Sequence, residues 1–314
     1  MQILDIKNLR VDFKKGKQFL NIVSGIDLKI EPAQIVGIAG ESGSGKTVSM
    51  LSLANLLPSF DCRISYDSYK VNRIKVDDKQ IPFFRGRLIS YIFQDPVPSL
   101  DPMFMIKSQL KEVLSLSSDH SVKNEVMEKL LKSVGLEDAE RVLNSYPHQL
   151  SGGMAQRVAI AIALASKSKI LVADEPTTAL DANLKKGILK LLKDLKDENN
   201  LSIFFVSHDL EQMFYIADRI YIFYAGMVVE AADASHIKKA PLHPYTAALL
   251  KCVPQRGKSS LIQIKGRSPN FTSLPSGCPF HPRCEFMDDI CQRMRPPLIE
   301  VKKGHFVRCF KVKK

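Results

Sequence analysis

The sequence has no apolar run long enough to cross a membrane. Its longest run, Val158–Ala165, has eight residues, whereas a helix needs about 20 residues to span a bilayer. Sustained heptads are also missing, and 25% of the 314 residues are charged while 45% are hydrophobic. These features exclude coiled-coil, collagen-like and disordered classes. The chain has enough apolar residues for one large or two modest packed domains.

The first residues lack the apolar stretch of a signal peptide, because Asp5, Lys7 and Arg10 stand where it would be. We therefore expect the chain to stay in the cytosol. Its net charge of +12 is uneven, since residues 251–314 hold 14 Lys or Arg against 4 Asp or Glu, a net of +10. Such a tail is typical of contact with nucleic acid or anionic lipid. Solvated lysines near a terminus explain it equally well.

Cysteine is scarce over most of the chain and concentrated at its end. Four of the six cysteines fall in the last 37 residues: Cys278, Cys284, Cys291 and Cys309. In a reducing cytosol this clustering favours metal ligation over disulfides. The other two, Cys62 and Cys252, are expected to be small buried hydrophobes.

Apolar patterns predict strands that alternate with helices. Ile3–Ile6 and Ile26–Ile30 alternate apolar and polar residues, as half-buried strands do. Continuous apolar runs at Ile35–Ala39, Ile170–Ala173 and Ile203–Val206 predict strands buried on both faces. Strand, helix and strand in this order predict an α/β fold with a parallel sheet and right-handed crossovers.

Helical spacing marks three helices. The first follows the strand at 35–39 and carries Val48, Leu51, Ala54 and Leu57. The second starts near Ser121 and is expected to bury Val122, Val126, Leu130 and Val134. The third lies before the strand at 203 and carries Leu184, Ile188, Leu191 and Leu195. From about Pro241 onward the periodicity fades, which predicts a small appended domain.

A glycine-rich segment between the strand at 35–39 and the first helix fits the pattern G-x-x-x-x-G-K-[ST]. Its residues are Gly40, Glu41, Ser42, Gly43, Ser44, Gly45, Lys46 and Thr47. Backbone N–H groups of such a loop surround the phosphates of a nucleotide. Lys46 is expected to reach the β- and γ-phosphates, and the Thr47 hydroxyl to ligate Mg²⁺. An ordinary Gly/Ser turn is the alternative, and the position between a buried strand and a helix disfavours it.

Acidic and basic residues end the two later strands. Asp174 is expected to hold Mg²⁺ and Glu175 to polarise an attacking water. Without the phosphate loop, this Asp-Glu pair would be interpreted as the solvated start of a loop. His208 follows the strand at 203–206, and a lone histidine is more often structural than catalytic. Ligands of open α/β sheets bind where such strands end, which favours a functional role for all three residues.

A second glycine pair opens the alanine-rich helix that runs through Ala165. Its first residues include Ser151, Gly152, Gly153 and Gln156. Ser151 is a good N-cap, and bare glycines at a helix start leave N–H groups free to bind an anion. Capping explains the serine and leaves the paired glycines unexplained. One nucleotide does not need two phosphate cradles in one chain, so this second cradle is expected to serve a partner's nucleotide.

These residues resemble ATP-binding-cassette ATPases in identity and order, from the phosphate loop through Gln94, Leu-Ser-Gly-Gly at 150–153, Asp174-Glu175 and Asp181 to His208. The resemblance implies a head-to-tail dimer with two ATP molecules between the chains, so that Ser151 and Gly153 act on the partner's nucleotide. Gln94 would sense Mg²⁺, the water and the coupling interface, and His208 would contact the γ-phosphate. Asp181 would connect the two sites, and Phe13 would stack on adenine, with Phe19 or a core role for Phe13 as alternatives.

Longer segments are similar to one subfamily, the ATPase subunits of bacterial oligopeptide, dipeptide and related nickel uptake systems. They are Ile92-Phe93-Gln94-Asp95-Pro96, Tyr146-Pro147-His148-Gln149, His243-Pro244-Tyr245-Thr246 and Gly277-Cys278-Pro279-Phe280-His281-Pro282-Arg283-Cys284. The resemblance implies an ATP-hydrolysing subunit on the cytoplasmic face of the inner membrane. Its partners would be a second ATPase subunit, identical or related, two transmembrane permease subunits and an extracytoplasmic solute-binding protein, with no nucleic acid. The alternatives are an ATPase for nickel or another small solute, and a nucleic-acid-associated cassette ATPase.

The four cysteines of the tail suit a tetrahedral zinc ion or an iron–sulfur cluster. Paired short spacings of the zinc-ribbon type are missing. The resemblance implies a [4Fe–4S] cluster held by these four residues, with His281 as a possible substitute ligand and zinc as the alternative. The expected organisation is a P-loop ATPase domain over 1–245, with a helical subdomain inserted at about 97–160, and a cysteine-rich domain over 246–314.

Overall fold

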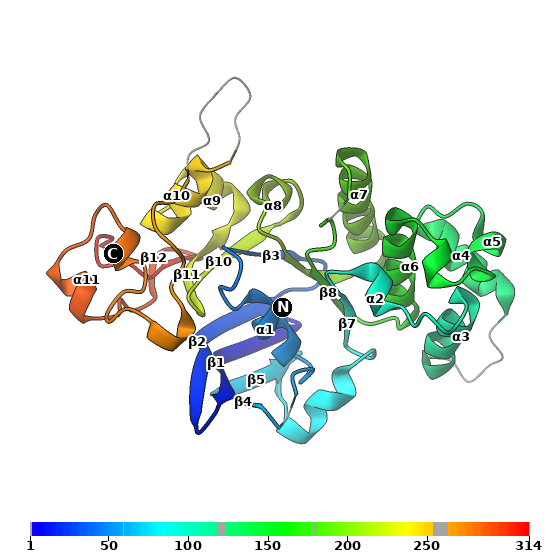
Figure 1. Cartoon of the computed structure of the whole chain (residues 1–314), viewed down its shortest axis with the longest axis horizontal. Helices are drawn as coiled ribbons and strands as arrows, with labels where there is room; N and C mark the ends of the chain where they lie inside the picture. Colours follow the sequence, from blue (N-terminus) through cyan, green and yellow to red (C-terminus); the bar gives the residue numbers. More distant parts are fainter. Residues whose placement is uncertain (1, 59, 118–122, 179, 254–262, 314) are drawn as a thin grey trace. The chain divides into compact units, whose positions relative to one another are not determined.

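The computed structural model describes residues 2–58, 60–117, 123–178, 180–253 and 263–313. The chain forms two compact units, one of residues up to 78 and from 205 onward, the other of residues 79–204 (Figure 1). The tail from residue 246 lies in the first unit, together with the phosphate loop. The predicted boundaries at 97, 160 and 245 remain predictions.

The first unit contains an antiparallel sheet. Its centre is β1 (Leu4–Lys15), which pairs with β2 (Gln18–Ile30), β4 (Cys62–Ser65) and β5 (Ser68–Val71), while β6 (Ile74–Lys75) pairs with β5. The two predicted half-buried strands are the paired ends of the β1–β2 hairpin, with Leu4 opposite Ile30 and Ile6 opposite Leu28. Both strands extend well beyond the alternating segments.

A second set of strands in this unit carries the phosphate loop. It consists of β3 (Ile35–Ala39), parallel to β10 (Arg219–Tyr224), followed by the antiparallel strands β11 (Met227–Asp233), β13 (His305–Val307) and β12 (Ile299–Lys302). Every residue of β3 is buried, as its continuous apolar run predicts. Two strands of the tail therefore extend the layer that positions the loop.

Short helices complete the first unit. They are α1 (Lys46–Ser52), α8 (Leu210–Ile216), α9 (Ala234–Lys239), α10 (Pro244–Lys251) and α11 (Asp289–Arg293), with 3₁₀ turns at Phe271–Ser273 and His281–Arg283. The predicted continuation of the first helix to Leu57 is wrong. Asn55 adopts the left-handed region at φ 52° and turns the chain away soon after Ser52.

The second unit contains two parallel strands and six helices among its described residues. Strands β7 (Ile89–Ile92) and β8 (Ile170–Asp174) pair in parallel, and β9 (Ser202–Val206) begins in this unit and continues into the first. The helices are α2 (Pro96–Ser99), α3 (Ile106–Ser117), α4 (Asn124–Ser133), α5 (Ala139–Leu143), α6 (Gly152–Ala165) and α7 (Ala182–Asn199). The 3₁₀ turns are Asp78–Phe84 and Pro147–Gln149. The predicted helices over 152–165 and 184–195 are confirmed.

The predicted buried face of α4 is confirmed at Val134 and wrong at Val126, which is 48% exposed. Met127 and Leu131, which were not predicted, are buried, and Leu130 is half-buried. Ser121 and Val122, where the helix was expected to begin, lie outside the described residues. A short helix with apolar residues at both 126 and 127 offers two stripes of similar spacing, and packing selected the one that Met127 belongs to.

A buried carboxylate on β11 bonds both to the segment before α10 and to a strand of the tail. Glu230 on β11 is fully buried and accepts hydrogen bonds from the backbone N–H groups of Leu242 (2.7 Å) and His243 (2.9 Å). His305 Nε2 on β13 lies 2.7 Å from the same carboxylate. The ring of His243 then caps α10, because its Nδ1 accepts a hydrogen bond from the N–H of Tyr245 (3.0 Å). Burial lowers the pKa of His243 to about 4.

The low pKa of His243 predicts a loss of stability in acid. The unfolded chain binds a proton near pH 6.5 and the folded chain only near pH 4. The contribution of neutral His243 to the free energy of unfolding is therefore fully present above pH 6.5. It is lost as the pH falls toward 4, and the loss is at most about 3 kcal/mol. Urea unfolding between pH 7 and 4.5 measures it. His243→Asn keeps a capping acceptor without the titration, and an unchanged acid dependence in that variant would contradict the assignment.

Candidate nucleotide site

The phosphate loop runs from the end of β3 to the first turn of α1. Gly40 has φ +147°, and a Cβ built on it would lie 2.3 Å from the carbonyl oxygen of Phe223 on β10. No other residue fits this close approach of two backbones. Further along the loop, the carbonyl of Ser44 accepts a hydrogen bond from the N–H of Gly226 at 2.9 Å. Strand β10 constrains the loop at Gly40, and the turn after it binds the loop at Ser44.

Lys46 closes the loop from inside. Its ammonium donates to the carbonyl oxygens of Gly40 and Glu41, both at 2.9 Å, and the residue is only 6% exposed. The hydroxyl of Ser44 is buried and has no hydrogen-bond partner within the described part of the chain. Thr47, one residue further, is exposed. A buried cation, a buried donor and an exposed hydroxyl in one loop suit a phosphate with its Mg²⁺.

His208 lies at the same sheet edge as the phosphate loop. The N–H of Ser207 donates to the carbonyl of Ile38 on β3 at 3.2 Å, so β9 and β3 end together. His208 follows as an exposed residue. Asp209 then caps α8 by accepting from the N–H groups of Glu211 and Gln212.

The two aromatic candidates for adenine stacking lie on the β1–β2 hairpin. Phe13 is half-buried and pairs with Leu20 on β2 and Cys62 on β4. Phe19 is 40% exposed, and the guanidinium of Arg63 lies 3.7 Å from the centre of its ring. Arg63 therefore already covers one face of Phe19, while Phe13 keeps part of its surface exposed.

In the second unit, Asp174 ends β8 as a buried residue and Glu175 follows it half-buried. Glu175 has φ +46°, a left-handed conformation that residues other than glycine rarely adopt. Its carboxylate accepts a hydrogen bond from the hydroxyl of Thr178 at 2.9 Å. Strained backbone of this kind is typical of functional sites. Ala179, part of the same motif, lies outside the described residues.

The second glycine pair begins α6 as predicted. Ser151 is the N-cap, with its hydroxyl accepting from the N–H of Met154 at 3.3 Å. Gly152 is exposed and open, whereas a Cβ at Gly153 would lie 2.9 Å from Leu184 on α7. Packing against α7 is thus one reason for the second glycine. Gln156 is 2% exposed, and its Nε2 has no partner within the described part of the chain.

The two remaining candidates in this unit, Gln94 and Asp181, flank helices. Gln94 is an exposed residue between β7 and α2. Asp181 is the N-cap of α7, because its Oδ1 accepts from the N–H groups of Asn183 (2.9 Å) and Leu184 (3.0 Å). The sequence analysis missed this cap, although Asp before an amphipathic helix is a recognised signal.

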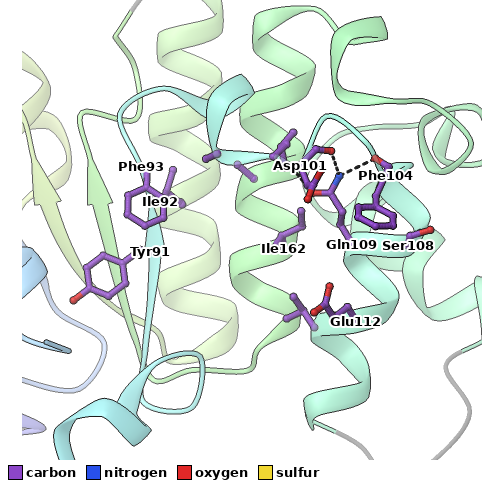
Figure 2. Close-up of a pocket in the computed structure, with 13 residues that line it drawn as sticks. Tyr91, Ile92, Phe93, Asp101, Phe104, Ser108, Gln109, Glu112 and Ile162 are labelled. Carbon is purple, nitrogen blue, oxygen red and sulfur yellow. Dashed lines mark hydrogen bonds between the residues drawn. The ribbon is translucent and has the colours of Figure 1, made fainter. Parts of the chain in front are cut away.

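A cavity of about 640 Å³ lies close to Gln94 in the same unit. Figure 2 shows Phe93 on one side and Phe104, Gln109 and Glu112 on the other, with Ile162 of α6 between them. The side-chain amide of Gln109 donates to the carbonyls of Asp101 (3.0 Å) and Phe104 (2.9 Å) and so fixes the segment before α3. The sequence analysis missed this site. The sequence signal is the apolar run Met103-Phe104-Met105 directly before α3, of which Phe104 lines the cavity and is 55% exposed.

The four cysteines of the tail line one small cavity, together with His281 and Phe280. Burial raises the pKa of all four thiols, that of Cys278 to about 11. No group of three or more His, Cys, Asp or Glu side chains within the described ranges is spaced to hold a single metal ion. Cys62 and Cys252, which were predicted to be buried, are only half-buried.

Comparison with known proteins gives a consistent result. Residues 23–178 match the model of the ABC transporter family, and residues 229–291 match the oligopeptide/dipeptide transporter C-terminal region. The chain is 40% identical to the oligopeptide transport ATP-binding protein AppD of Bacillus subtilis, over 98% of this chain and 96% of that protein. It is 38% identical to the dipeptide transport ATP-binding protein DppD of Haemophilus influenzae, over 95% and 92% of the two chains.

The chain belongs to the ABC transporter family. Among solved structures it is similar to the dimeric ATP-binding cassette MJ0796 in a post-hydrolysis state bound to ADP and Pi, with a TM-score of 0.64 and 30% identity. That match covers 74% of this chain and 98% of the cassette. The predicted P-loop ATPase fold and the ATPase activity of an ABC transporter subunit are confirmed. Within the described ranges, no helix has the length and apolar character needed to cross a bilayer.

Lys46→Ala tests the phosphate loop of this ABC ATPase. The variant should bind a fluorescent ATP analogue at least tenfold more weakly, because a charge-assisted hydrogen bond contributes about 1.5–3 kcal/mol. Equilibrium titration of the fluorescence measures the dissociation constant. Lys303→Ala removes an exposed lysine of the same unit and should bind as the unaltered chain does. Equal affinity in both variants would contradict the role of Lys46.

Proposed function

We propose that this chain hydrolyses ATP to drive the import of di- or oligopeptides through separate permease subunits. The observation that carries the proposal is the phosphate loop around buried Lys46, in a chain whose relatives over nearly its full length are named peptide transport ATP-binding proteins. The C-terminal match to the oligopeptide/dipeptide transporter region supports peptide as the cargo.

Each site residue then has a role in ATP hydrolysis. The phosphate loop binds the triphosphate, and Thr47, Gln94 and Asp174 hold Mg²⁺. Glu175 polarises the attacking water, and His208 contacts the γ-phosphate. Phe13 stacks on adenine. The left-handed conformation of Glu175 and the bond from Thr178 support its assignment, because both restrict where the carboxylate can lie.

A second ATPase subunit completes each site. Ser151, Gly152, Gly153 and Gln156 would bind the nucleotide held by the partner's phosphate loop, and Asp181 would link the two sites. Gly152 is open, and the buried Nε2 of Gln156 has no partner among the residues that the structure describes; both support a ligand at this helix start. The similar cassette MJ0796 is described as a dimer bound to ADP and Pi, which supports the arrangement.

The 640 Å³ cavity near Gln94 is the place where we expect a permease subunit to dock. Exposed apolar residues that line it, Phe93 and Phe104, support a protein partner there. ATP shifts the ATPase between states, and the permease can use that shift only through contacts that differ between them. The chain would therefore act peripherally on the cytoplasmic face of the membrane. An extracytoplasmic solute-binding protein would deliver the peptide.

Nickel transport and a nucleic-acid partner are weaker alternatives. Both relatives named above transport peptides by name, which favours peptide over nickel. The basic tail was the argument for nucleic acid. Several of its cations already have partners in the structure, since Arg283 pairs with Glu41 and Lys311 with Asp288.

We also propose that the tail holds a [4Fe–4S] cluster. Cys278, Cys284, Cys291 and Cys309 line one cavity, and thiolates are the ligands such clusters use. Burial raises the pKa of these thiols, that of Cys278 to about 11, and thiols must lose their protons to bind, so binding of a cluster would release protons. When bound, the cluster would cross-link a segment with little core of its own.

Glu175→Gln tests the hydrolytic role. The variant keeps the shape and loses the charge of the base, so ATP turnover should fall at least about 100-fold while the affinity for ATP stays within about threefold. Steady-state phosphate release and nucleotide titration measure the two quantities. Glu198→Gln changes an exposed carboxylate at the end of α7 and should leave both unchanged. Unchanged turnover in Glu175→Gln would remove this residue from its role.

Cys284→Ser tests the cluster. Anaerobic purification of the unaltered chain should give about four irons and four sulfides per chain, with a broad absorbance around 400 nm. The variant should lose most of that iron and become sensitive to protease in the tail. Cys62→Ser, outside the cavity, should keep it. One zinc and no iron in the unaltered chain would contradict the cluster and leave the ATPase assignment intact.

A further inference from the structure

Glu41, the second residue of the phosphate loop, is held by residues from the end of the chain. Its N–H donates to the hydroxyl of Tyr245 at 2.9 Å. Its carboxylate accepts hydrogen bonds from both terminal nitrogens of Arg283, with N···O distances of 2.7 Å and 2.9 Å. It also accepts a hydrogen bond from the hydroxyl of Ser268. Only its carbonyl stays within the loop, where it accepts from Lys46. The tail therefore fixes the side chain of this residue, and Tyr245, directly before the tail, fixes its backbone.

Arg283 is itself rigidly placed. It precedes Cys284 in the cysteine-rich segment, and its side chain is 5% exposed. Its Nε donates to the carbonyl of Lys265 at 2.9 Å, and its guanidinium lies 5.8 Å and 5.9 Å from the ring centres of Tyr224 and Phe280. The planar guanidinium forms two parallel hydrogen bonds to the carboxylate and is itself held by other hydrogen bonds. It therefore fixes the orientation of the carboxylate, which a lysine cannot do.

The negative charge of Glu41 would oppose the binding of a nucleotide unless the Arg283–Glu41 pair compensated it. A carboxylate beside Gly40 adds negative charge to a loop that would bind a triphosphate. The pKa of Glu41 is lowered, because the bonds from Arg283 and Ser268 outweigh the effect of burial, which alone would raise it. The side chain is therefore ionised at neutral pH and needs a counter-charge. Arg283 supplies that charge in bidentate geometry.

We propose that Arg283 is a positioning residue of the nucleotide site. It neutralises Glu41 and holds the phosphate loop in the conformation that accepts the triphosphate of ATP. The inference rests on the proposed function, since it assumes that the loop binds ATP. It makes the affinity for ATP depend on the fold of the cysteine-rich tail.

The first test is the affinity of Arg283→Gln for a fluorescent ATP analogue. The dissociation constant should rise at least tenfold. Arg293→Gln removes the same charge from an exposed residue of the same tail and should bind normally. Thermal unfolding of each variant checks its fold. If Lys46→Ala weakens binding while Arg283→Gln binds within twofold of the unaltered chain, this inference fails and the proposed function stands. If Lys46→Ala binds normally, the proposed function itself fails.

The second test separates positioning from tail folding. Removing the carboxylate as well, in Glu41→Gln with Arg283→Gln, should recover at least threefold of the lost affinity, because the uncompensated charge is gone. A role confined to tail folding predicts no recovery, and that result would overturn the proposal. Where the single variant does not fold, the double variant decides alone. Folded protein that binds the analogue within about threefold of the unaltered chain supports the inference, and weaker binding overturns it.

Discussion

The bidentate pair between Arg283 and Glu41 is the contact through which the tail holds the side chain of the phosphate loop's second residue. One side of the phosphate loop is fixed by β3 and by the close approach of Gly40 to the carbonyl of Phe223. The carbonyl of Ser44 accepts from the N–H of Gly226, and between these two points Glu41 is held by side chains from beyond residue 240. A loop that binds phosphate through its own N–H groups must keep them oriented before the ligand arrives, or the ordering cost weakens binding. The tail supplies part of that order.

The tail thus contributes to the nucleotide site in addition to holding its own cysteines. Strand β13 pairs with β11, and Glu230 bonds to the backbone before α10 and to His305. Phe280 packs at 5.3 Å from the rings of both Tyr224 and Tyr245, and Tyr245 in turn bonds to Glu41. An ATPase subunit built in this way cannot lose the fold of its tail without disturbing the loop. This also gives part of the tail's positive charge a defined use.

Much of the fold could be predicted from the sequence because its signals are local. The apolar run of β3, the phosphate loop and the capped start of α6 each lie within about fifteen residues, and each was found. Most of the buried face of α4 was not predicted. Val126 and Met127 belong to two apolar faces of similar spacing, and only packing decides which of them is buried. The cavity near Gln94 depends on segments that meet only in the folded unit. Arg283 and Glu41 are 242 residues apart, and no spacing rule connects them.

Amide hydrogen exchange of the phosphate loop tests the central claim most directly. Exchange at residues 40–47 would be compared between the unaltered chain and Cys284→Ser, with α6 as an internal reference in the other unit. The account predicts that the loop exchanges faster in the variant while α6 is unchanged. Faster exchange confined to residues 278–291, with the loop as protected as before, would contradict it.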